Sequence, residues 1–168
     1  ILFPILVGLF VTAKDIILVL LTEKWISALP FVKILSLVGV FSAMSVINLN
    51  VINSLGKSGD SLKADIVSKL FIAMSLFLSY RLGLKAMALS YLVATIFSYL
   101  LYAHIQTKYL GVNIISQFRS CFKGILSAIL IGGIVSFMLY CLGVNVSSFI
   151  RLFLAGIVGI VLYVVMYV

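Results

Sequence analysis

Two charged residues interrupt the first apolar run of the sequence. Lys14 and Asp15 lie within residues 2–21, a run that ends at "LLTEKW". Each charge inside a bilayer costs about 3 kcal/mol, and such residues are candidates for function. If the helix continues to Lys24 at the surface, Lys14 lies about 15 Å deeper, near mid-bilayer. We therefore expect Lys14 to face a polar cavity and attract an anionic substrate, with Asp15 as its local counter-charge.

The same two charges allow a second interpretation. A helix displaced or broken near Lys14 would let both side chains reach lipid headgroups or each other. Adjacent helical residues point about 100° apart, so Lys14 and Asp15 are not an ideal facing pair. Both interpretations stay open at this point.

Three amides follow near the end of the second apolar run, at Asn48, Asn50 and Asn53. Amides buried in lipid need partners, so they either bond to neighbouring helices or line water. Bonding between helices is the favoured interpretation. Asn50 and Asn53 are kept as candidates for a substrate path.

Two further polar patterns have helical spacing. Asp65 and Lys69 lie four residues apart, which predicts a structural ion pair on one helix face, with Lys69 also a substrate-path candidate. The next run carries polar residues at 4-3-4 spacing on one face, which indicates either a cavity wall or a packed helix interface. They are Tyr91, Thr95, Ser98 and Tyr102.

Small residues recur every four positions in the last two apolar runs. They are Gly124, Ala128, Gly132 and Ser136 in the first of these, and Ala155 and Gly159 in the second. Stripes of small residues let helix backbones approach closely. We therefore expect the helix over 121–142 to pack against the helix over 148–168.

Signatures of catalysis are missing from the sequence. It contains no Ser-His-Asp set, no H-E-x-x-H motif and no Walker motif. It also lacks a Cys-His cluster with metal-ligand spacing. We expect a protein that is not an enzyme and that has no cofactor and no metal site.

Composition identifies the solvent around these residues. Of the 168 residues, 64% are hydrophobic and 10% are charged, whereas a soluble domain is roughly a quarter charged. The net charge of +8 then belongs to juxtamembrane lysines and arginines, and nucleic-acid binding is not expected. Runs of about 20 apolar residues predict an all-α, polytopic transmembrane helix bundle with about six membrane-spanning helices. These runs are 2–21, 29–53, 62–80, 86–106, 121–142 and 148–168.

The distribution of basic residues predicts the orientation of the bundle. One side collects Lys57, Lys63, Lys108, Arg119 and Lys123, and the other collects Lys24, Arg81, Lys85 and Arg151. The side with more basic residues is expected to be cytoplasmic. The loops before 62–80 and before 121–142 are therefore predicted to lie in the cytoplasm.

The order of these features resembles a known family. Pro4 and Gly8 open a helix that runs to "LLTEKW", followed by "ALPFVKIL" with Pro30, "NSLGKSGDSLK" and a hairpin around "YRLGLKAMALSY". This is similar to the C-terminal portion of bacterial polysaccharide flippases, the Wzx-like branch (O-antigen and colanic-acid types) of the multidrug/oligosaccharidyl-lipid/polysaccharide exporter superfamily. The motifs cover about residues 4 to 110. The family often has Gly where Thr22 stands and Gly near Ala86.

The resemblance implies a larger protein of fourteen helices, of which this chain would be a fragment. Residues 1–107 would be the last four helices of the C-terminal six-helix lobe, 108–120 a cytoplasmic connector, and 121–168 the final two-helix hairpin. Such proteins sit in the bacterial inner (plasma) membrane as multi-pass proteins. They move undecaprenyl-pyrophosphate-linked oligosaccharide units to the periplasmic leaflet by alternating access.

The resemblance also implies the partners: the lipid-linked oligosaccharide with its polyprenyl diphosphate, membrane lipids, and a possible polysaccharide polymerase. Lys14 would attract the diphosphate, and the uncharged final hairpin would flank the polyprenyl tail. Two alternatives remain. A multidrug or cation antiporter of the same superfamily would use embedded acids, and a membrane scaffold subunit would transport nothing.

Overall fold

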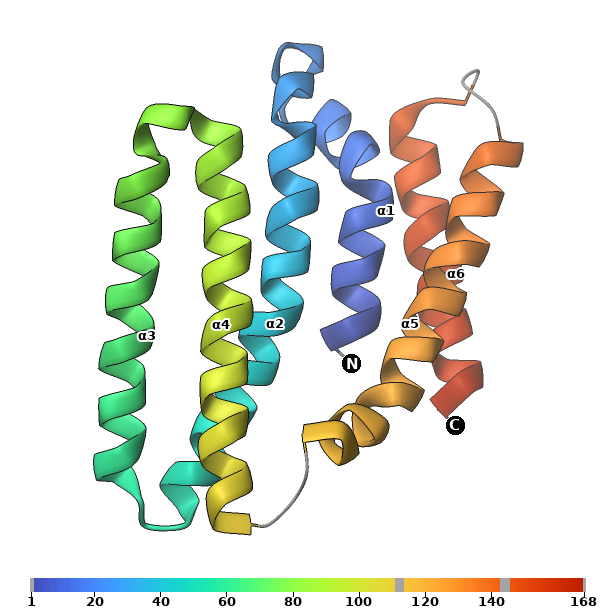
Figure 1. The fold of residues 1–168 in the computed structure, drawn as a ribbon. Helices are drawn as coiled ribbons and strands as arrows, with labels where there is room; N and C mark the ends of the chain where they lie inside the picture. Colours follow the sequence, from blue (N-terminus) through green and yellow to red (C-terminus); the bar gives the residue numbers. More distant parts are fainter. Residues whose placement is uncertain (1, 111–113, 143–145, 168) are drawn as a thin grey trace. The chain divides into compact units, whose positions relative to one another are not determined.

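The computed structural model describes residues 2–110, 114–142 and 146–167, and this part of the chain is helical, with no strand (Figure 1). The α-helices are α1 (Leu2–Leu20), α2 (Leu29–Ser54), α3 (Ser58–Ser79), α4 (Leu84–Leu110), α5 (Ile114–Cys141) and α6 (Ser148–Tyr167). Two short 3-10 helices, η1 (Glu23–Ala28) and η2 (Tyr80–Leu82), lie in the first and third connections. The predicted all-α helix bundle is confirmed.

Four helical segments of the described residues are long and apolar enough to cross a membrane. They are Phe3–Leu20, Glu23–Ser54, Leu84–Leu110 and Ser148–Met166. The predicted spans 62–80 and 121–142 are helical but are not among them. Charged residues from Asp60 to Lys69 occupy the first half of α3, and the apolar part of α5, Leu126–Cys141, is shorter.

The helices form two compact units. Unit 1 comprises Ile1–Ser36 and Cys121–Val168, and unit 2 comprises Leu37–Ser120. The helix α2 is continuous through the boundary. Of the predicted connector 108–120, the first residues end α4 and the residues from Ile114 begin α5, whereas 111–113 lie outside the described residues. The division into 1–107 and 121–168 stays a prediction.

Unit 1 is held together by close helix packing. Ile131, Val135 and Leu139 of α5 form a buried cluster with Ala155 of α6, and Val11 of α1 packs against it. A Cβ added to Gly132 would clash with Cγ1 of Val7. The absence of a side chain at position 132 therefore allows α1 and α5 to approach closely.

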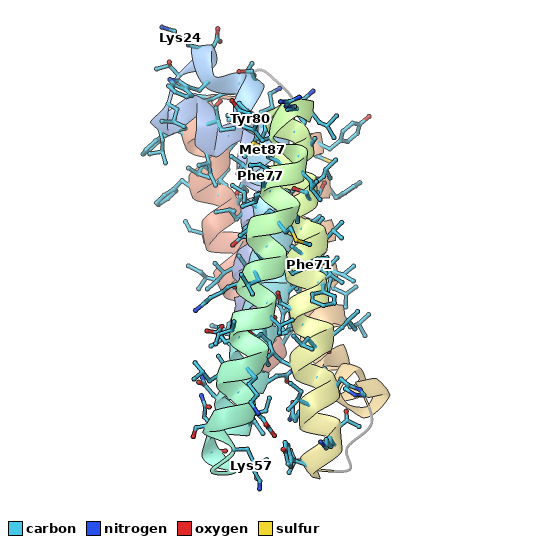
Figure 2. The ribbon with its side chains drawn as sticks, turned by 60° about the vertical axis from the view of Figure 1, so that its left-hand side comes forward. Lys24, Lys57, Phe71, Phe77, Tyr80 and Met87 are labelled. Atoms are coloured by element: carbon cyan, nitrogen blue, oxygen red, sulfur yellow. The ribbon has the colours of Figure 1, made fainter. Side chains whose placement is uncertain are left out.

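Unit 2 contains the antiparallel hairpin of α3 and α4. Figure 2 shows Lys57 at one end of this hairpin, Tyr80 and Met87 at the other, and Phe71 between them. The two helices are joined by hydroxyl groups, because Ser68 donates to Ser98 and the Ser79 and Ser90 hydroxyls lie 2.7 Å apart. Thr95, Ser98 and Tyr102 are buried, so these members of the polar face of α4 belong to a helix interface.

The first connection differs from the expectation that one helix continues to Lys24. The helix α1 ends at Leu20, and Lys24 lies in η1. Thr22 has φ 72 and ψ 169, a region of backbone space that glycine occupies and other residues avoid. Lys14 is therefore six residues from the helix end, about 9 Å by the helical rise. The predicted depth of about 15 Å below Lys24 was wrong, since the chain leaves the helix before reaching it.

Thr22→Gly is expected to stabilise the protein. The Thr22 conformation costs about 1–3 kcal/mol for a residue with a Cβ, and the added freedom of an unfolded glycine offsets about 0.4–1 kcal/mol of the relief. The expected gain is about 1 kcal/mol, seen as a higher midpoint of thermal unfolding in detergent. Thr22→Ala keeps the Cβ and is the matched control. An equal gain from Thr22→Ala would show that backbone strain at this position is not the cause.

Gly132→Ala is expected to destabilise unit 1. The new methyl group meets Val7, whose β-branched side chain has little freedom to turn away, and such overpacking costs about 1–3 kcal/mol. Gly133→Ala on the same helix is the control, because nothing lies within 4 Å of its added Cβ. Thermal unfolding should show a lower midpoint for Gly132→Ala alone, and adding Val7→Ala should restore it. A loss that persists with Val7→Ala would contradict the proposed clash.

Candidate functional site

The buried charge of unit 1 is the carboxylate of Asp15. Its side chain is 3% exposed, and Oδ1 lies 3.5 Å from Nε of Arg151, whose side chain is 17% exposed. This distance exceeds the 2.7–2.9 Å of a charge-assisted hydrogen bond, and neither atom has a hydrogen-bond partner among the described residues. Asp15 and Arg151 thus form an ion pair between α1 and α6 that neutralises charge without a hydrogen bond.

The expected pairing of Asp15 with Lys14 is replaced by this contact. Lys14 is exposed on α1, and among the described residues no carboxylate lies within the 4.0 Å of an ion pair from its ammonium group. The physical reason is helical geometry, since adjacent side chains diverge by about 100°. Asp15 is therefore directed to α6, and Lys14 keeps its positive charge uncompensated.

A second cation lies near the same helix. Nζ of Lys33 in α2 is 5.4 Å from the ring centroid of Phe10 in α1, a cation–π contact. Lys33 is half-buried, and the sequence reasoning did not single it out. The available signal was a lone lysine inside an apolar run.

An apolar groove of about 390 Å³ lies among α1, α5 and α6. Gly8 and Thr12 line it from α1, Gly132 from α5, and Ala155 and Gly159 from α6. The Thr12 hydroxyl donates to the carbonyl of Gly8 in its own helix, at 2.8 Å. The small side chains among the lining residues leave room for an apolar group.

The predicted packing residues have different environments. Ala128, Gly132 and Ala155 are buried, Gly124 and Gly159 are half-buried, and Ser136 is exposed. Contact between α5 and α6 runs mainly through larger residues, because Ile131, Val135 and Leu139 surround Ala155. Gly132 meets α1 as well, so the small residues serve both an interface and the groove.

The other candidates lie in unit 2. Asn50 and Asn53 are exposed, whereas Asn48 is buried and its Nδ2 has no hydrogen-bond partner among the described residues. Asn53 and Asp65 line a second groove, of about 450 Å³. The predicted ion pair of Asp65 with Lys69 is confirmed, with Nζ 2.6 Å from Oδ2. The Lys69 side chain is otherwise exposed.

One end of the α3–α4 hairpin carries a charged cluster around the start of the predicted span 62–80. Asp60 accepts a hydrogen bond from the Tyr109 hydroxyl, and this bond lowers the pKa of Asp60 below its usual value, with Lys63, Lys108 and Lys57 adding to the effect. Lys57 and Lys108 also lie 5.4 and 5.9 Å from the Tyr109 ring centroid. The cluster ties the start of α3 to the end of α4.

Arg151 is the residue whose role the sequence reasoning missed, because it was counted only among the basic residues on one side of the membrane. The structure places it in the first turn of α6. The sequence did contain a signal: Arg151, Ala155 and Gly159 recur every four residues, so Arg151 continues the small-residue face that packs inward.

Arg151→Ala is expected to destabilise the protein by about 3–5 kcal/mol, because it leaves the buried Asp15 carboxylate without a counter-charge. Adding Asp15→Asn should recover most of that loss, since no buried charge then remains. Unfolding in detergent measures both variants, and Arg81→Ala in the exposed η2 segment is the control for loss of an arginine. Additive losses from Arg151→Ala and Asp15→Asn would contradict a coupled pair.

Comparison with known proteins finds no matching protein family and no matching solved structure. The chain is similar to the teichuronic acid biosynthesis protein TuaB of Bacillus subtilis (strain 168), with 26% identity over 147 residues. The match covers 87% of this chain and 29% of TuaB, so the chain spans less than a third of the length of this relative. The chain is a helical membrane protein that is similar to part of a protein of teichuronic acid biosynthesis.

Proposed function

We propose that the protein takes part in polysaccharide biosynthesis as a flippase, which moves undecaprenyl-pyrophosphate-linked oligosaccharide units across the bacterial inner membrane by alternating access. Similarity to a teichuronic acid biosynthesis protein supports the pathway class. The motif order around Pro30 and Lys57 supports the transporter class. The protein moves its cargo without changing it chemically, and a polysaccharide polymerase is its proposed partner.

The observation that carries this proposal is the division of α1 into two faces. Gly8 and Thr12, one turn apart, line the apolar groove. Phe10 and Lys14, also one turn apart, are offset from them by two residues, or about 200° around the helix. One face of α1 is therefore apolar and grooved, and the opposite face presents a cation.

A lipid-linked oligosaccharide has the two chemistries that these faces fit. Its diphosphate is anionic and attracts a lysine that has no acidic partner among the described residues. Its polyprenyl chain is apolar and elongated, and it fits a groove built from α1, α5 and α6. In this proposal the diphosphate passes along the Lys14 face of α1 and the polyprenyl chain along the groove on its opposite face, so both parts of the cargo move together.

The arrangement of acids disfavours a cation antiporter. Such a transporter needs a carboxylate that is open to its cation or proton. Asp15 is buried against Arg151, and Asp65 is paired with Lys69. Each of these two carboxylates already has a basic partner, so neither is open to a transported cation.

The proposal is tested in cells that lack the gene. Lipid extracts should accumulate undecaprenyl-linked oligosaccharide while surface polysaccharide is lost, and the intact gene should reverse both changes. Lys14→Ala should fail to restore export at normal membrane levels, whereas Lys14→Arg should restore part of it because the charge remains. Lys24→Ala, in the exposed η1 segment, is the control.

Normal lipid-linked and surface polysaccharide in the deletion strain, with no second flippase present, would refute the flippase and favour the antiporter or the scaffold. Full export by Lys14→Ala would leave the flippase standing and remove Lys14 from its mechanism.

A further inference from the structure

We propose that Lys14 and Lys33 together form a two-cation site for a phosphate-type anion, with Phe10 holding Lys33 in place. The ligand is the diphosphate group of a polyprenyl lipid or a free phosphate of the same chemistry. The inference deepens the proposed function, and the choice of a lipid-linked diphosphate rests on it.

The two lysines lie over the same face of α1. Phe10 and Lys14 are four residues apart, so their side chains are neighbours on that face. Nζ of Lys33 is 5.4 Å from the Phe10 ring centroid. The ring therefore brings the ammonium group of Lys33 to the side of α1 that carries Lys14, although the two lysines belong to different helices.

Both lysines also lie at a similar level in the membrane-spanning helices. Lys14 is six residues before the end of α1, and Lys33 is four residues after the start of α2. By the helical rise these positions are about 9 and 6 Å from the helix ends that η1 connects. The site is thus near the η1 connection, at the end predicted to be periplasmic.

Asp15, the acid next to Lys14 in the sequence, is held elsewhere. Asp15 is directed to Arg151 of α6, and among the described residues neither lysine has a carboxylate within the 4.0 Å of an ion pair. Two like charges over one helix face repel each other. A phosphate-type dianion between them would remove that repulsion and supply the missing counter-charge.

The lysine geometry favours phosphate over a planar carboxylate. Lysine ammonium groups act as compact point charges with rotatable donors, which suit the tetrahedral oxygens of phosphate. A diphosphate carries enough charge to engage both lysines at once. The half-buried position of Lys33 raises the strength of the attraction, because the surroundings screen charge less than water does.

The experiment uses the full-length protein in phosphatidylcholine nanodiscs. Inorganic pyrophosphate is titrated by calorimetry, and a second set of discs contains undecaprenyl diphosphate, whose retention is measured by native mass spectrometry. Lys14→Gln and Lys33→Gln should each weaken binding about tenfold, and Phe10→Leu should weaken it less, because Lys33 keeps its charge but loses its ring contact.

Matched variants separate the site from general electrostatics. Lys24→Gln removes the same charge from the exposed η1 segment and should change binding less than twofold. Lys33→Arg keeps the positive charge and should retain anion binding. Retention would show that a substitution at this position does not by itself abolish binding. Equal weakening by Lys24→Gln, or no effect of Lys14→Gln and Lys33→Gln in either set of discs, would overturn the proposal.

The two ligand sources give different results. Lysine-dependent retention of undecaprenyl diphosphate supports the lipid headgroup, and lysine-dependent binding of pyrophosphate alone supports a free phosphate. Failure of the proposed function is separable from failure of the site. Lysine-dependent binding combined with normal levels of lipid-linked oligosaccharide in the deletion strain would support the anion site and reject the flippase. Accumulation of lipid-linked oligosaccharide in the deletion strain, without lysine-dependent binding, would support the flippase and reject the anion site.

Discussion

Every polar group that enters a bilayer has to find its hydrogen-bond partner inside the protein, because hydrocarbon supplies none. Helices meet this need for the backbone. Hydroxyl side chains in this protein meet it either within their own helix, as when Ser45 donates to the carbonyl of Phe41 at 2.8 Å, or across the α3–α4 hairpin, as when Ser68 donates to Ser98. Small polar residues can therefore be spread through apolar helices, and they then determine which helix faces pack together.

Charges obey the same constraint more strictly, and this separates structural charges from functional ones. Asp65 and Lys69 satisfy each other within one helix, and Asp15 and Arg151 do so between two helices. Lys14 and Lys33 differ, since neither has an acidic partner in the described chain. Positive charge that a fold leaves uncompensated inside apolar helices is available to a ligand, and this argument underlies both the transport proposal and the anion site.

Much of the fold could be predicted from hydropathy, because a bilayer requires apolar runs of fixed length. The predicted run 29–53 became Leu29–Ser54, and 148–168 became Ser148–Tyr167. The end of α1 could not be predicted, because it depends on a backbone conformation at Thr22 that the apolar pattern does not reveal. The Arg151 partner of Asp15 was missed for a different reason. Pairs between distant helices leave no local pattern, although the four-residue spacing of Arg151 from Ala155 indicated which way it faces.

The ion pair of Asp15 with Arg151 has a consequence for biosynthesis. The helix α1 is synthesised and inserted before α6, so Asp15 enters the membrane without its partner, at a cost of about 3 kcal/mol. That carboxylate stays uncompensated while α2 to α5 are made. Until Arg151 arrives, α1 carries a charge without a counter-charge and has to remain near the insertion machinery. Packing of unit 1 is therefore complete only when α6 closes onto α1.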